Sequence, residues 1–83
     1  MGEALPRIEI DPGVRLDGDL FVPGVRSSDP AIREGDEVAL VRDGELAAVG
    51  EAALPGALLQ GLARGLAVRV RHRAPRATDI AKT

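Results

Sequence analysis

A β-hairpin between Glu37 and Gly50 constrains the fold of this 83-residue chain more than any other segment. Asp43-Gly44 separates two runs rich in β-forming residues, and this dipeptide favours a two-residue type I′ turn, in which both positions have φ > 0. The turn sets the register of the two strands. The predicted pairs are Arg42 with Glu45, Val41 with Leu46, Leu40 with Ala47, and Val38 with Val49. Apolar residues on both faces predict that the hairpin is covered on both sides.

Shorter strands are predicted on either side of the hairpin. Apolar residues alternate with polar ones in segment 7–11, and segment 20–22 ends at Pro23-Gly24. Segment 66–72 predicts a strand in which Arg69, Arg71 and Arg73 share one face, because side chains alternate along a strand. Between these strands, segment 26–31 is predicted to be a polar loop and segment 14–17 is too short for a confident helix.

A helix is predicted over Pro55–Arg64. Leu58, Leu59 and Leu62 would share one face, and Gly65 would end the helix. Two internal glycines weaken it by roughly 1 kcal/mol each relative to alanine. The order of short strands and glycine-rich turns indicates a small barrel or sandwich.

Composition excludes several classes of protein. The length predicts one domain, the absence of cysteine rules out disulfides and thiolate metal sites, and no apolar run approaches the roughly 20 residues of a membrane-spanning helix. The N-terminus lacks the pattern of a secretory signal, so we expect a cytoplasmic protein. Net charge is −2, yet segment 64–83 holds six basic groups and one acid. This asymmetry suits a local phosphate-binding site better than general binding to polyanions.

A set of short motifs occurs in a fixed order. They are Gly18, Pro23-Gly24-Val25, Ile32, Gly35-Asp36-Glu37-Val38, Ala48-Val49-Gly50, Gly65-Leu66-Ala67-Val68 and His72. Together they resemble the PUA domain, in its archaeal and eukaryotic RNA-binding form, over roughly residues 8–72. The chain departs from that family in two respects. The family usually has a helix of about two turns between the first two strands, and only Pro12–Asp17 lies there. Its second helix also commonly starts with a polar, Glu-containing segment, where this chain has Leu54-Pro55-Gly56-Ala57.

The resemblance implies a mainly β fold, a PUA-like pseudo-barrel of about five to six short strands with one or two short helices. The domain would span residues 1–73, followed by a polar tail over 74–83. It implies a non-catalytic module, without cofactor or metal, that recognises structured RNA such as a tRNA acceptor stem or a duplex end in RNA modification or translation. The implied RNA-binding residues are Gly18, Leu20, Phe21, Val22, Pro23, Arg69, Arg71, His72 and Arg73.

Several of these residues also have ordinary structural interpretations. The three arginines suit phosphate contact, since the guanidinium matches phosphate geometry, but they also suit a solvated strand face. Phe21, the one aromatic residue, is expected to anchor the core, with base stacking as the alternative. His72 is expected to point inward with Val70 as a packed or capping side chain.

Two hypotheses about partners remain open from the sequence. The first is a monomer that binds tRNA-like RNA, beside or fused to an RNA-modifying enzyme and without a role at membranes. The second is a protein-interaction domain that docks onto such an enzyme or complex without touching RNA, for which the acidic segment 1–63 would suit a basic partner. An enzyme is disfavoured, because the sequence shows no nucleophile–base pair or metal cluster.

Overall fold

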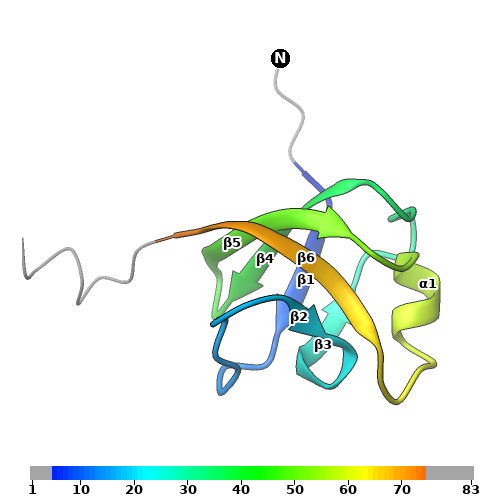
Figure 1. Cartoon of the computed structure of the whole chain (residues 1–83), viewed down its shortest axis with the longest axis horizontal. Helices are drawn as coiled ribbons and strands as arrows, with labels where there is room; N and C mark the ends of the chain where they lie inside the picture. The colour runs from blue at the N-terminus through cyan, green and yellow to red at the C-terminus, as the bar shows by residue number, and fades with distance from the viewer. Residues whose placement is uncertain (1–4, 75–83) are drawn as a thin grey trace, which may run out of the picture.

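Six strands form one curled sheet in the computed structural model, which describes residues 5–74 (Figure 1). The strands are β1 (Arg7–Ile10), β2 (Leu20–Phe21), β3 (Val25–Ser28), β4 (Glu37–Arg42), β5 (Glu45–Ala52) and β6 (Leu66–Arg73). Their order in the sheet is β2-β6-β5-β4-β1-β3. The pairing of β1 with β4 is parallel and the other pairings are antiparallel. The predicted mainly β pseudo-barrel of five to six short strands is confirmed, as a curled half-barrel sheet.

The two edges of the sheet are joined by a 3-10 helix, η1 (Val22–Gly24), which leads directly from β2 to β3. Two backbone hydrogen bonds fix this crossing. The amide of Val22 donates to the carbonyl of Gly65 at 2.7 Å, and the amide of Asp11 donates to the carbonyl of Gly24 at 2.9 Å. Because β2 and β3 lie at opposite ends of the strand order, this short connection requires the sheet to curl.

The core inside the curl is built from aliphatic side chains. Its fully buried members with the largest side chains are Ile8, Ile10, Leu20, Ile32, Leu40, Val38 and Val68. Ser28 is buried too, and its hydroxyl donates to the carbonyl of Gly56 at 3.0 Å, which satisfies it. Phe21 is 57% exposed, so the prediction that it anchors the core is wrong.

The hairpin of β4 and β5 confirms the predicted turn and corrects half of the register. Asp43 has φ 51° and Gly44 has φ 81°, as a type I′ turn requires. The two pairs nearest the turn are as predicted, but a β-bulge then shifts the pairing by one residue. Leu40 therefore faces Ala48 and Val38 faces Gly50.

This shift decides which face of the hairpin is buried. Val38 and Ala48 lie in the core, Val49 is half-buried, and Leu46 is 54% exposed. The hairpin is therefore covered fully on one face, and the predicted cover on both faces is wrong. The apolar residues of the second face have no covering layer, because the six strands form one curled sheet with a single core cluster.

Two further segments differ from their predictions. The predicted polar loop at 26–31 overlaps β3, an edge strand that lacks an apolar pattern because Arg26 and Ser27 are exposed. The predicted helix at 55–64 is a single turn, α1 (Gly56–Leu59). Leu59 is buried in it, whereas Leu58 and Leu62 are exposed.

Gly56 explains why this helix is short. A Cβ atom there would lie 2.0 Å from the carbonyl oxygen of Asp29, so the start of α1 is pressed against the end of β3. Glycine also propagates a helix poorly, and the chain must reverse at Gly65, with φ 131°, to enter β6. Within residues 5–74 no helix is long and apolar enough to cross a membrane. Ala74 still bonds to Ala47, while the rest of the predicted tail at 74–83 lies outside the described residues.

Candidate RNA interface

The surface predicted to contact RNA is centred where β2 lies beside the first half of β6 (Figure 1). Leu20 pairs with Val68 and Phe21 pairs with Leu66. Of the residues implied by the family resemblance, Leu20 and Val22 are buried and give their side chains to the core. Phe21 and Pro23 are exposed. They are therefore the members of this segment whose side chains a ligand can reach.

Gly18 lies on an exposed turn just before β2. A Cβ atom added to it would meet no atom within 4 Å, and its φ is not in the positive range. Neither backbone conformation nor packing therefore requires a glycine at this position. Because glycine has no side chain, the space beside this backbone is open, and a ligand can approach it closely.

The arginines of β6 do not form the predicted row. Arg69 faces Glu51 and Val70 faces Gly50, but His72 is the next paired residue and faces Val49. Arg71 is thus the extra residue of a β-bulge, after which the two faces of the strand are exchanged. Arg73 faces Ala48, a core residue, so the prediction that it shares the outward face with Arg69 and Arg71 is wrong.

The same bulge corrects the prediction for His72. The sequence pattern placed it inward with Val70, but it is exposed and lies opposite Val49 on the outer face. Alternation along a strand predicts faces only while pairing is regular, and one inserted residue reverses every later assignment.

Acidic groups offset the arginines on this outer face. A terminal nitrogen of Arg71 lies 2.6 Å from a carboxylate oxygen of Glu51, and the two form an ion pair. Asp19 lies nearby, because its side chain accepts a hydrogen bond from the amide of Val70 at 3.1 Å. Arg73 donates to the carbonyl oxygen of Leu16 at 2.6 Å. Arg69 is therefore the exposed arginine of β6 for which no hydrogen bond or ion pair is found among residues 5–74.

A groove next to η1 was not foreseen from the sequence. We call it the η1 groove; it has a volume of about 560 Å³ and is lined by Val22, Pro23, Val25, Arg26, Ser27, Leu59, Gln60, Leu62 and Ala63. Gln60 is held in place, since its amide donates to the carbonyl of Ser28 at 3.2 Å. Arg26 contributes a cation, and the apolar walls come from η1, the start of β3, the end of α1 and the residues after it.

Arg64 is exposed and directly precedes Gly65, whose carbonyl accepts the hydrogen bond from Val22 of η1. The sequence signal for Arg64 was its place in the basic segment 64–83. No signal singled out Arg26, which stood in a segment predicted to be a loop. Within residues 5–74, no group of three or more metal-ligating side chains is close enough to hold a metal ion.

Comparison with known proteins gives a consistent result. The family model of the PUA domain matches residues 6–74. The chain is 45% identical over 58 residues to archaeosine synthase subunit alpha of Thermococcus kodakarensis, a match covering 70% of this chain and 10% of that protein. The chain thus spans about a tenth of the length of this curated relative.

Solved structures share the fold. A conserved PUA domain protein from Thermoplasma acidophilum superposes with a TM-score of 0.77 at 30% identity, covering 90% of this chain and 53% of that one. An H/ACA ribonucleoprotein bound to a substrate RNA gives a TM-score of 0.76 at 30% identity, covering 88% of this chain and 25% of the matched chain. The relatives include proteins of RNA modification, and each is longer than this chain.

Proposed function

The chain belongs to the PUA domain family, and from that membership we propose that it is a non-catalytic module that binds structured RNA, such as a tRNA acceptor stem or the end of an RNA duplex. It would act in the cytoplasm as a monomer, beside or fused to an RNA-modifying enzyme. The relation to a subunit of archaeosine synthase supports tRNA as the RNA. The relation to a ribonucleoprotein solved with its substrate RNA supports RNA contact by this fold.

The observation that carries the proposal is the exposed surface around β2 and η1. It combines an open backbone at Gly18, the exposed ring of Phe21 and the exposed Arg69. An aromatic ring offers a stacking surface to an unpaired base, while arginines position phosphates without reading sequence. Recognition would thus depend on the shape of the RNA and on a splayed end, with the exposed arginines setting the register.

The test is a salt titration with a variant of the β6 arginines. Arg69→Gln plus Arg71→Gln removes two cations without placing new carboxylates beside Glu51. We expect weaker binding to tRNA and a slope of log affinity against log salt that falls by about 1.4 to 1.8, or about 0.7 to 0.9 for each lost phosphate contact. Affinity is measured by fluorescence anisotropy at several salt concentrations.

The matched control is Arg7→Gln plus Arg33→Gln, which makes the same change in net charge at two exposed arginines on β1 and on the turn before β4. An equal loss in both double variants would mean that bulk charge, and not this face, determines binding. A tRNA without its 3′ end tests the predicted contact with a single-stranded end. If the unaltered chain binds no RNA at low salt, the RNA proposal fails.

The second candidate is a docking module for an RNA-modifying enzyme, without direct contact to RNA. It is favoured by the offset of the β6 arginines by Glu51 and Asp19 and by the exposed Leu58 and Leu62. The same titration separates the two functions, because docking predicts no salt-dependent binding to RNA by the isolated chain.

A further inference from the structure

The segment that presents Gly18 has no regular structure of its own. Residues 11–19 carry neither helix nor strand, although they connect β1 to the edge strand β2. An ion pair within the segment joins Arg15 to Asp17 at 3.6 Å, but the two side chains are 81% and 75% exposed. Ion pairs this exposed contribute little to order. Hydrogen bonds inside the segment close only the turn at its start, where the amides of Gly13 and Val14 donate to Asp11 at 2.9 Å and 3.0 Å. The other hydrogen bonds that hold residues 14–19 come from outside the segment.

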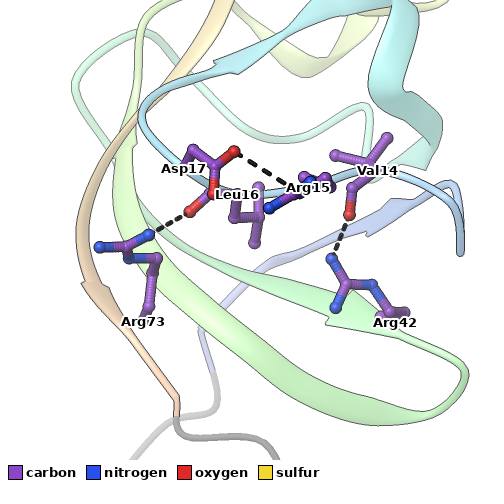
Figure 2. Close-up of polar contacts among 6 residues, drawn as sticks. All are labelled: Val14, Arg15, Leu16, Asp17, Arg42 and Arg73. Atoms are coloured by element: carbon purple, nitrogen blue, oxygen red, sulfur yellow. Dashed lines mark hydrogen bonds and ion pairs between the residues drawn. The ribbon is translucent and has the colours of Figure 1, made fainter.

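Two arginines from the sheet hold the segment through its backbone carbonyls (Figure 2). Arg42, at the end of β4, donates to the carbonyl oxygen of Val14, and Arg73, at the end of β6, donates to the carbonyl oxygen of Leu16 at 2.6 Å. These two carbonyls are two residues apart, and the Leu16 side chain between the two contacts is buried. Hydrogen bonds from a charged donor are about twice as strong as neutral ones.

The far end of the segment has its own anchor. The carboxylate of Asp19 accepts a hydrogen bond from the amide of Val70 in β6 at 3.1 Å. Gly18 therefore lies between two anchored parts of the chain: residues 14–16, which the two arginines hold, and Asp19, which is bonded to β6. The turn is held from both directions, while Gly18 itself faces open space.

The arrangement around Arg42 is unfavourable in one respect. Its Nε atom is buried and has no hydrogen-bond partner among the described residues. A buried donor without a partner destabilises the folded state, and ordering a long arginine side chain removes rotamer freedom. Any apolar residue would avoid the unpaired donor, and a short one would also lose less rotamer freedom, so stability alone is a poor reason for an arginine here. A defined position for the Val14 carbonyl is a better one.

We propose that Arg42 and Arg73 are positioning residues that hold segment 14–19 in the single conformation in which the Gly18 turn can receive RNA. Arg73 acts through the Leu16 carbonyl and does not contact phosphate, in contrast to the expectation from the sequence. The effect on RNA binding rests on the proposed function. The holding of segment 14–19 rests on the hydrogen bonds of the two arginines.

The test compares Arg42→Met plus Arg73→Met with Arg42→Lys plus Arg73→Lys. Methionine removes the donor and the charge but keeps a long side chain, while lysine keeps one charge and a donor for each carbonyl. Hydrogen exchange of the amides of residues 14–19 is measured without RNA. We expect exchange in this segment to become at least about tenfold faster in the methionine variant and to return close to normal in the lysine variant.

RNA affinity and its salt dependence are measured on the same proteins. If the methionine variant keeps the binding conformation in only about a tenth of its molecules, its affinity falls about tenfold, because apparent affinity scales with the competent fraction. We expect the slope against salt to stay unchanged, since no phosphate contact is lost. Lysine should restore the affinity.

Three results would overturn the proposal. Exchange in segment 14–19 that is unchanged by methionine would show that the arginines do not hold it. A salt slope reduced by about 0.7 to 0.9 for each arginine would show direct phosphate contact. Affinity unchanged despite faster exchange would show that RNA does not need the held conformation. If the unaltered chain binds no RNA, the proposed function fails, and the exchange measurement alone then decides whether the segment is held.

Discussion

The centre of the sheet and the segment before β2 each contain a glycine, and the two glycines are there for opposite reasons. At Gly50 in β5, an added Cβ would lie 2.4 Å from the carbonyl oxygen of Arg69 and 2.8 Å from a methyl carbon of Val68. At Gly18 an added Cβ would meet nothing. The first glycine is required by the fold, because β5 and β6 approach too closely for a side chain. The second is not required by the fold.

The two regions also differ in which groups form hydrogen bonds with their backbone. In β4, β5 and β6 the backbone groups are used by strand pairing, and the inner side chains fill the core. In segment 11–19 two carbonyls are bonded by arginine side chains, and the turn at Gly18 is open. A region whose groups are all satisfied internally can support a ligand site but has little to offer a ligand. The difference favours the Gly18 turn as the place where a ligand can approach the backbone, beside the exposed side chains of Phe21 and Arg69.

The largest effect is expected from Gly50→Val. The side chain would collide with backbone atoms of β6, which cannot move without separating two paired strands. We expect a loss of about 3 kcal/mol in the free energy of unfolding, at the upper end of the usual range for overpacking. Chemical denaturation followed by circular dichroism measures it. Gly18→Val is the control in the same assay, and equal destabilisation of both variants would contradict the comparison.

The fold was predictable where local chemistry determines it. Asp43-Gly44 specifies the turn of the hairpin, and the turn gives the first two strand pairs. The register beyond them was not predictable, because the bulges arise from the curl of the whole sheet and leave no mark in the local pattern. The bulge at Arg71 changes the predicted site most, because it exchanges the faces predicted for His72 and Arg73.

The candidate site was predictable only in part, for a related reason. Family motifs led to Gly18 and the segment after it, but they did not distinguish the buried Leu20 and Val22 from the exposed Phe21. A single aromatic residue was expected in the core because burial of a ring is favourable. Aliphatic residues from five of the strands, together with Leu16, Val22, Ile32 and Leu59, fill the core without an aromatic ring. Arg42 was assigned only to the pair with Glu45, and its contact with Val14 depends on how distant segments pack.

A smaller effect, on binding alone, is expected from substitutions at Gly18. Alanine should leave the free energy of unfolding unchanged or raise it by up to about 1 kcal/mol, because it restricts the unfolded chain and meets no atom in the folded one. Affinity for RNA should fall as the side chain grows, reaching about tenfold, or about 1.4 kcal/mol, for valine. Anisotropy titration measures this series. A series without any change in affinity would mean that RNA does not approach the backbone at Gly18.

The smallest effect is expected from Glu51→Gln, which removes the ion-pair partner of Arg71. The two side chains are 63% and 33% exposed, so the pair contributes no more than about 1 kcal/mol to stability. If the Arg71 guanidinium contacts RNA as proposed, this ion pair competes with that contact. Freeing the Arg71 guanidinium should strengthen RNA binding by about two- to fivefold, and the gain should shrink as salt rises.

The control is Glu34→Gln, the same charge change on an exposed turn. If both variants gain equally, the effect is one of net charge. If Glu51→Gln gains nothing, Arg71 is not a phosphate contact and the proposed interface is reduced to the Gly18 turn, Phe21, Arg69 and the η1 groove.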